Sequence, residues 1–220
     1  MDGSKAVVGR DVFDTFSPVI DFPSLRLQIS LAFGNGWEMR HWDISVAFTN
    51  ALPEEPTYVR FPKNMPDDVI SGFKGGDYAL LRRNLYGSKT APKLWYKCLI
   101  ECLTTLGFVL VAGHPCLLIR KTSVNGMQII IVIAIFVDDL LVTGNDLAQI
   151  ELVKQSVATT FALTDEGKLE YYLGGELEYK DQNTLVLHQR GYIKKLLERF
   201  GMVDCNPKAT PLDVDLNLSL

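Results

Sequence analysis

The sequence lacks the features that would assign it at once to a function class, beginning with a surplus of positive charge. Its 22 Lys and Arg residues are outnumbered by 26 Asp and Glu, and the formal net charge is −4. Composition therefore argues weakly against nucleic-acid binding, although a local basic surface is still compatible with it because binding depends on where the charge lies. Long apolar runs are also missing. The most apolar stretch, residues 129–137, is far too short to cross a bilayer, so we expect a buried strand there and no membrane partner.

Cysteine is scarce and shows no pairing pattern. The four cysteines form no CxxC motif, and the N-terminus lacks the charged-then-apolar pattern of a signal peptide. We therefore expect an intracellular, reducing compartment, the cytoplasm. Cys98 and Cys102 have a spacing that suits a metal site on a helix, but no His pair follows at zinc-finger spacing, so buried thiols are the favoured interpretation.

The composition that is present is ordinary for a globular protein, with 47% hydrophobic and 22% charged residues in 220. That length suffices for one large domain or two small ones. Two local groups of basic residues are each as consistent with a solvated helix face as with nucleic-acid contact. The first group is Arg82, Arg83, Lys89, Lys93 and Lys97, and the second is Lys194, Lys195 and Arg199.

Hydrophobic patterning and turn residues predict the elements of the first half of the chain. Residues 38–44 are typical of a strand, which leads into a short helical or turn segment ending at Phe48. Four prolines between residues 53 and 66 predict an irregular stretch. A proline in the first turn and Gly107 after the last predict a helix over residues 91–106.

The clearest local signal is a pair of apolar, β-branched runs, residues 116–120 and 128–136, joined across an Asn-Gly dipeptide suited to a tight hairpin turn. The second run continues into Asp138 and Asp139, after which residues 140–143 resume the apolar pattern. We therefore expect the acidic pair at the tip of a hairpin.

The second half of the chain also alternates helices with strands. Because neighbouring strands are joined by hairpins, the pattern favours an α+β domain with an antiparallel sheet over a doubly wound one. The remaining predicted elements are a helix capped by Asn145 or Asp146 and running to about residue 160, a hairpin of residues 171–179 and 185–188, and a helix over residues 192–200 that Gly201 ends.

Three aspartates at two strand ends are the residues with the clearest chemical potential. Asp138 and Asp139 repel each other beside an apolar strand, and a divalent cation such as Mg²⁺ relieves that repulsion. A bare acidic pair is more often a polar turn, and Asp43, after the strand 38–44, could equally cap the next turn. Together, however, the three carboxylates are what a two-metal phosphoryl-transfer site requires.

Six segments, in order, carry a resemblance to one family. Residues 43–48 (DISVAF) resemble the first catalytic motif of reverse transcriptases, and residues 136–139 (FVDD) resemble their paired-aspartate hairpin. Residues 85–96 (LYGSKTAPKLWY) are similar to the nucleotide- and template-binding motif of copia-type retrotransposons. The other three segments are residues 9–19, which resemble the lead into the palm, residues 172–176 (YLGGE), which resemble the primer-holding hairpin, and residues 192–212, which resemble the segment that follows it.

The resemblance to a copia-type retrotransposon reverse transcriptase implies a fold and a set of partners. The fold would be a right-hand polymerase palm with an antiparallel sheet, incomplete fingers and the start of a thumb. Residues 1–190 would form the palm with the partial fingers, and residues 191–220 would begin the thumb or connection. The partners would be an RNA/DNA template-primer and deoxynucleoside triphosphates, within a virus-like particle in an intact element.

The same resemblance implies roles for individual residues. Asp43 and Asp138 would hold two Mg²⁺ ions, with Mn²⁺ as an alternative, while Asp139 supports the site and the Ile44 carbonyl is a further ligand. The other implied residues are Val46 and Ala47, whose amides would face the triphosphate, Phe48, which would exclude a 2′-hydroxyl, Thr90 for nucleotide binding, and Leu173, Gly174 and Gly175 for primer binding.

The sequence departs from the family pattern at several points. Thr90 stands where the family usually has a glutamine that contacts the nucleotide, so we expect weaker binding. Phe136 replaces the usual tyrosine, and Ala51 replaces a glycine. Residues before Gly9 do not resemble the basic strand of the fingers, where Lys5 is the nearest basic residue. The chain stops shortly after residue 211, without a ribonuclease H, protease or integrase segment, so we expect a piece of a longer polyprotein.

Two other interpretations compete with a polymerase. A catalytically inactive remnant that only binds nucleic acid or a partner stays open. A phospho-receiver domain would also have an apolar strand ending in two acids, but it needs a phosphoacceptor aspartate after a later apolar strand. Residues 179–183 form a polar turn instead, so that interpretation fails on spacing.

Overall fold

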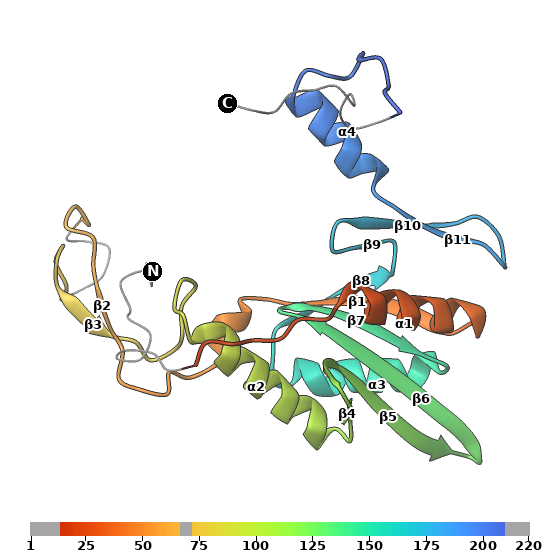
Figure 1. The fold of residues 1–220 in the computed structure, drawn as a ribbon. Coiled ribbons are helices and arrows are strands. Elements are labelled where there is room, and N and C mark those ends of the chain that lie inside the picture. The colour runs from red at the N-terminus through yellow and green to blue at the C-terminus, as the bar shows by residue number, and fades with distance from the viewer. Residues whose placement is uncertain (1–13, 67–71, 210–220) are drawn as a thin grey trace. The chain divides into compact units, whose positions relative to one another are not determined.

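The two apolar runs on either side of the Asn-Gly dipeptide form the two longest strands of an antiparallel sheet (Figure 1). The computed structural model describes residues 14–66 and 72–209, and the chain divides into two compact units, residues 1–169 and 170–220. Within the described residues, the helices are α1 (Phe22–Gly34), the 3-10 helix η1 (Ala47–Asn50), α2 (Ala91–Thr105), α3 (Leu147–Ala158) and α4 (Arg190–Arg199). The strands are β1 (Glu38–Ile44), β2 (Tyr58–Arg60), β3 (Tyr78–Leu80), β4 (Val109–Val111), β5 (His114–Val124), β6 (Met127–Phe136), β7 (Asp139–Gly144), β8 (Leu163–Lys168), β9 (Tyr171–Tyr172), β10 (Gly175–Tyr179) and β11 (Leu185–His188).

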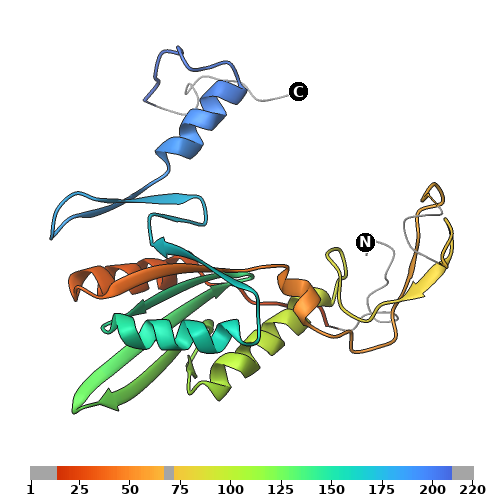
Figure 2. The same ribbon diagram turned by 180° about the vertical axis from the view of Figure 1, so that it is seen from behind.

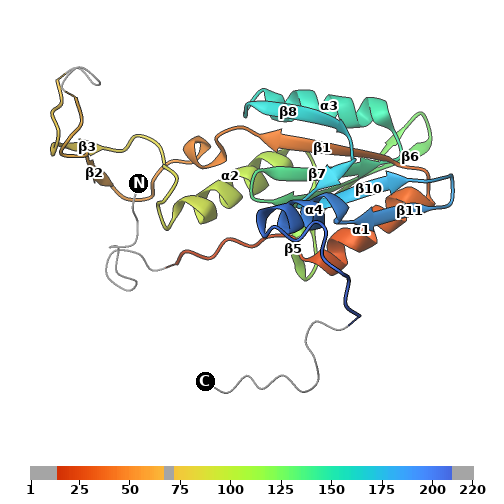
Figure 3. The ribbon, with the colours of Figure 1, turned by 90° about the horizontal axis from the view of Figure 1, so that it is seen from above.

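Six strands of the first unit form one sheet in the order β4-β5-β6-β7-β1-β8, and every neighbouring pair is antiparallel. Strands β4 to β7 follow one another through short turns. Strand β1 comes much earlier in the chain and lies between β7 and β8, as Figure 3 shows. Its insertion brings the end of β1 beside the β6–β7 turn. A separate two-stranded sheet pairs β2 with β3.

Helices cover both faces of this sheet. Every residue of β7 after Asp139 is buried, and because successive side chains of a strand point to opposite faces, both faces must be covered there. Helix α1 lies in front of the sheet in Figure 1, and α3 lies in front in Figure 2. The buried amide of Gln28 on α1 donates to the carbonyl of Leu141, 3.3 Å away. A Cβ at Gly144 would meet the Ile130 carbonyl oxygen at 2.8 Å and Ile150 of α3 at 3.2 Å, so only glycine fits there.

Capping residues set the starts of two helices. Helix α1 is capped by Asp21, whose carboxylate accepts a hydrogen bond from the amide of Ser24 at 2.8 Å. Helix α3 is capped by Asp146, which accepts from the amide of Gln149 at 2.9 Å. Of the two predicted caps for α3, the structure therefore selects Asp146 over Asn145. No helix in the described ranges combines the length and the apolar character needed to cross a membrane.

The second unit contains a small antiparallel sheet in the order β11-β10-β9, followed by α4. A tight turn at Leu173 and Gly174 joins β9 to β10, and both residues have positive φ, 47° and 79°. Residues 171–179 are therefore two strands with a turn between them, rather than one arm of a hairpin. The expected hairpin with residues 185–188 is confirmed for the second of these strands, because β10 pairs with β11.

Most predicted elements match the structure, as does the α+β class with antiparallel sheets. Strand β1 agrees at both ends, the β5–β6 hairpin turns at the predicted dipeptide, and α2, α3 and α4 agree within two residues at nearly every end. The prediction of an irregular stretch over residues 53–66 was wrong in part, because Tyr58–Arg60 forms β2. Residues 9–13 and 210–212 of the family-like segments, and Lys5, lie outside the described residues. The compact units divide after Leu169, and the assignment of residues 1–190 to palm and fingers and of 191–220 to thumb stays a prediction.

Candidate active site

The β6–β7 turn and the end of β1 bring the three predicted aspartates together. Phe136 pairs with Asp139 across the hairpin, which leaves Val137 and Asp138 as the two turn residues. Asp139 also pairs with Asp43 of β1, and the amide of Ile44 donates to the Asp138 carbonyl at 3.0 Å. The sheet register therefore fixes all three aspartates at one edge.

Positive backbone φ angles mark the predicted site segments. The described residues contain four non-glycine residues with positive φ, and three of them fall in these segments: Val46 at 48°, Val137 at 58° and Leu173 at 47°. This conformation is unfavourable for bulky and β-branched side chains, costing about 1–3 kcal/mol each. Such strain persists where the surroundings enforce it, and it concentrates at functional sites.

Burial and mutual repulsion raise the pKa values of two of the three aspartates. Burial, and then the negative charge of Asp139, raises the pKa of Asp43 above its ordinary value of 3.8. Burial likewise raises the pKa of Asp138, and the charges of Asp139 and Asp43 add to the effect. Asp139 is held differently, since its Oδ1 lies 2.7 Å from Nε2 of His41. Asp43 and Asp138 are thus the pair whose charge a cation would compensate.

The donor chemistry of this pair suits a hard divalent cation, and two carboxylates with a nearby main-chain carbonyl are oxygen ligands of the kind Mg²⁺ takes. Across residues 14–66 and 72–209, no three or more His, Cys, Asp or Glu side chains are grouped as a ready-made metal site. The contact of Asp139 with His41 is consistent with that finding. The assignment of metal to Asp43 and Asp138 with the carbonyl of Ile44, supported by Asp139, stays a prediction.

The raised pKa of Asp43 affects the stability of the metal-free protein. Because the folded-state pKa of Asp43 lies above its unfolded value, stability is lost as pH rises through the window between 3.8 and the raised pKa. We expect Asp43→Asn to remove this penalty and to raise the free energy of unfolding at pH 7 by about 0.2–1 kcal/mol, the usual size of the interaction between two side chains directly opposite across two strands. Urea unfolding in EDTA measures the change.

The matched control is Asp204→Asn, which alters an exposed aspartate of the second unit and should leave stability unchanged. The Asp43→Asn gain should disappear below pH 3.8, where the carboxyl is neutral in both states. An Asp43→Asn variant that is less stable than the wild type at pH 7 in EDTA would show that the carboxylates do not repel one another as described.

The segment after β1 presents the residues predicted to face the nucleotide. Val46 is 60% exposed in its left-handed conformation, and Ala47 begins η1 fully buried. The Phe48 ring packs against Tyr86, with ring centroids 4.6 Å apart and planes at 45°. The structure places Thr90 as the residue before α2, with its hydroxyl 3.3 Å from that of Ser88. The nucleotide-binding roles of these residues stay predictions.

Two aromatic residues of the 85–96 segment contribute to the site, although sequence reasoning gave them no role. The indole N–H of Trp95, a side chain only 1% exposed, donates to the Val137 carbonyl at 2.7 Å. Burial raises the pKa of Tyr86, and the charges of Asp138 and Asp43 raise it further. The only feature of the sequence that pointed to Tyr86 and Trp95 was their position within the motif of residues 85–96.

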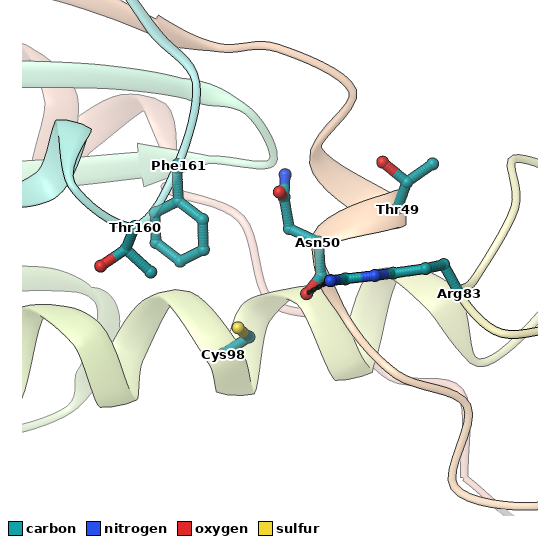
Figure 4. A pocket seen from close by; sticks show the side chains of 6 residues that line it. All are labelled: Thr49, Asn50, Arg83, Cys98, Thr160 and Phe161. Atoms are coloured by element: carbon teal, nitrogen blue, oxygen red, sulfur yellow. Dashed lines mark hydrogen bonds between the residues drawn. The ribbon is translucent and has the colours of Figure 1, made fainter.

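A polar pocket of about 430 Å³ lies next to η1 and is separate from the aspartates. Figure 4 shows the Arg83 side chain extending toward Asn50, whose carbonyl accepts a hydrogen bond from it at 3.3 Å. Two lysines of the first basic group are partly neutralised, because Lys93 pairs with Asp14 and Lys97 with Glu54. The pocket is lined by Thr49, Asn50, Arg83, Cys98, Thr160 and Phe161.

The cysteines and the predicted primer-binding residues are the last of the predicted positions. All four cysteines are free, but Cys98 and Cys102 are only partly buried, so the expectation of buried thiols at these two positions is met in part. In the second unit, Leu173 and Gly174 form the β9–β10 turn, and a Cβ at Gly175 would meet Leu187 at 2.9 Å. The hairpin expected there is present, and its contact with a primer stays a prediction.

The fold and the site define an α+β domain whose antiparallel sheet gathers three carboxylates at adjoining strand ends. Residues 1–214 match the family model described as "Reverse transcriptase (RNA-dependent DNA polymerase)". The chain belongs to this reverse transcriptase family, and its relatives are Pol polyproteins of copia-like transposons. Members of the family generally use divalent metal ions.

Two curated relatives illustrate the match. The chain is 32% identical over 212 residues to the "Retrovirus-related Pol polyprotein from transposon RE1" of Arabidopsis thaliana, which covers 96% of the chain and 14% of that protein. It is 31% identical over 218 residues to the corresponding polyprotein from transposon TNT 1-94 of Nicotiana tabacum, covering 99% of the chain and 16% of that protein. The chain therefore spans about one seventh of the length of these relatives.

Proposed function

We propose that this chain is an RNA-directed DNA polymerase domain that extends a primer by two-metal nucleotidyl transfer. The observation that carries the proposal is the meeting of Asp43 and Asp138 at adjoining strand ends, with the pKa of each raised by burial and by neighbouring carboxylates. Such a pair holds negative charge at a cost that a bound cation removes, which is the electrostatic requirement of a metal-dependent centre.

Each acidic residue has a distinct task in this proposal. When bound, two Mg²⁺ ions would supply activation of the primer 3′-hydroxyl and neutralisation of charge on the departing pyrophosphate. Asp43 and Asp138 hold the ions, and the Ile44 carbonyl is a further ligand. Asp139 acts indirectly, because its bond to His41 restrains the hairpin that carries Asp138.

The backbone after β1 receives the nucleotide. Exposed, left-handed Val46 turns the chain so that its amide can bind the triphosphate. The amide of Ala47 donates to the phenol of Tyr86 in this structure and would have to exchange that partner for the triphosphate. Phe48 stands next to these two residues and excludes a 2′-hydroxyl from the sugar. Thr90 offers a shorter side chain than glutamine, so nucleotide affinity is lower than in relatives that carry glutamine there.

The two units have different tasks in binding the template-primer. The first unit supplies the palm and part of the fingers, and the turn at Leu173, Gly174 and Gly175 in the second unit holds the primer strand of a template-primer duplex. The thumb begins after residue 190. The cytoplasm is the proposed place of action, in keeping with four free thiols.

Primer extension on an RNA template tests the proposal. Purified protein, a labelled DNA primer on RNA, deoxynucleoside triphosphates and Mg²⁺ should give elongated primer, and EDTA should abolish it. The matched control is Asp138→Asn, purified in parallel. Extension no greater than that of the control would reject the enzymatic function and leave the inactive binding protein as the alternative, which a template-primer binding assay would then detect.

A further inference from the structure

Two aromatic rings from distant parts of the sequence pack against each other close to the end of β1. Phe48 belongs to η1, and Tyr86 belongs to the connection between β3 and α2. Their centroids lie 4.6 Å apart with the planes tilted by 45°, a close packing that fixes each ring relative to the other. Phe48 thus has a partner that limits its rotation.

The charges of the acidic site act on the phenol of Tyr86. Its pKa is raised first by burial and then by the charges of Asp138 and Asp43, with an opposing contribution from the backbone amide of Ala47 as a hydrogen-bond donor. Tyr86 is nevertheless 46% exposed, so part of the residue is open to solvent. Tyr86 therefore contacts Phe48 of the segment after β1 and is subject to the charges of both carboxylates.

The backbone holds Tyr86 firmly in this position. Residues 85–88 form a turn in which the amide of Ser88 donates to the Leu85 carbonyl at 3.1 Å, and Gly87 supplies a φ of 93° at the third position. Tyr86 is the second residue of this turn, which has the signature of type II. The buried side chain of Asn84 donates to the Ala51 carbonyl at 3.2 Å and so ties the turn to the end of η1.

We propose that Tyr86 is a specificity-determining residue of the nucleotide site, whose ring holds Phe48 in the orientation that excludes a ribose 2′-hydroxyl. The inference rests on the proposed function, which assigns the sugar-facing role to Phe48. Tyr86 is a positioning residue in this scheme, since it acts through the second ring. Its hydroxyl contributes less than its ring, because the ring makes the contact with Phe48.

The test measures discrimination without requiring catalysis. A complex with a dideoxy-terminated primer on RNA binds the next nucleotide but cannot incorporate it, so Kd values for dGTP and GTP opposite a template C give the selectivity directly. We expect Tyr86→Ala to reduce the preference for dGTP by about 3- to 10-fold, the effect of losing one aromatic pair. Tyr86→Phe should retain the preference, since the ring is kept.

Two further variants separate selectivity from folding. Tyr78→Ala removes a tyrosine ring from β3 that is 63% exposed, and it should leave the ratio of Kd values unchanged. Tyr86→Leu keeps apolar bulk without a planar ring and should lie between Ala and Phe, which preserves the test if Tyr86→Ala unfolds. Equal selectivity in wild type, Tyr86→Leu and Tyr86→Ala would overturn the inference, as would a wild type that binds dGTP and GTP equally.

Primer extension by the same proteins keeps the two proposals distinguishable. Tyr86-dependent selectivity in the terminated complex without any extension from a normal primer would reject the polymerase activity and support the inference. Extension with selectivity that is unaffected by Tyr86→Ala would support the activity and reject the inference.

Discussion

Asp138→Asn is expected to lower primer extension by about a thousandfold, the loss that corresponds to several kcal/mol of metal-dependent transition-state stabilisation. Asparagine has nearly the shape of aspartate but provides no negative charge for a cation. Asp43→Asn should lose as much, because both side chains hold the same ions. Single-turnover incorporation of one deoxynucleotide on an RNA template measures the loss.

Asp139→Asn is the matched control for Asp138→Asn, since it removes the same charge from the neighbouring residue. Its carboxylate contacts His41, 2.7 Å away, rather than standing free for metal. We therefore expect a smaller loss of about 10- to 100-fold, the usual effect of altering a partner behind the ligands. Equal losses at positions 138 and 139 would contradict the separate roles assigned to them.

Trp95→Phe should have a large effect outside the aspartates, because it removes the hydrogen bond to the turn that carries Asp138. Phenylalanine keeps most of the ring that packs against Phe161, with centroids 5.0 Å apart, but it cannot donate to the Val137 carbonyl. Leaving that carbonyl unpaired should cost about 1–3 kcal/mol of stability. The turn should also shift, lowering kcat by about 10- to 100-fold, since small misplacements near the chemistry have effects of that size.

Trp42→Phe provides a matched control for the stability change. Trp42 is fully buried in β1, and its indole N–H has no hydrogen-bond partner among the described residues. The same substitution there removes a similar ring area but no hydrogen bond. Urea unfolding should show Trp95→Phe to be less stable than Trp42→Phe. Equal stabilities of the two variants, together with an unchanged kcat for Trp95→Phe, would show that the hydrogen bond from Trp95 does not hold the turn in place.

The local elements of the site could be predicted from sequence because each depends on neighbouring residues. The apolar run before Asp138 and the apolar run after Asp139 predict two strands and a turn, whichever other parts of the chain they meet. Strand β1 is predictable for the same reason. The placement of the acidic pair at a hairpin tip therefore required no knowledge of the fold.

The pairing of β1 with β7 could not be deduced in this way. Asp43 and Asp139 are opposite residues in a register that depends on which strands become neighbours, and a slip of one residue would send Asp43 to the other face. Only the motif resemblance suggested that the two ends meet. The contacts of Trp95 with Val137 and of Tyr86 with Phe48 are long-range for the same reason, so their roles appear only in the structure.

The missed elements have physical explanations of their own. Strand β8 has the sequence LTDEGK, whose polar residues are tolerated because it lies at the edge of the sheet with only alternate positions partly covered. Helix α1 buries polar Ser24 and Gln28 among its apolar residues, and this weakens the periodic pattern that would have revealed it. Gln28 is useful inside because its amide bonds to the sheet.

Counting bound Mn²⁺ ions tests the central claim, that Asp43 and Asp138 together form the metal-dependent centre. The count is made by electron paramagnetic resonance on the protein with a dideoxy-terminated primer on RNA and the next deoxynucleotide, beside an Asp43→Asn/Asp138→Asn double variant. The wild type should retain about two ions per complex, as a two-metal site requires, and the double variant should lose the protein-dependent binding. The same number of ions bound with the same affinity in both proteins would contradict the claim.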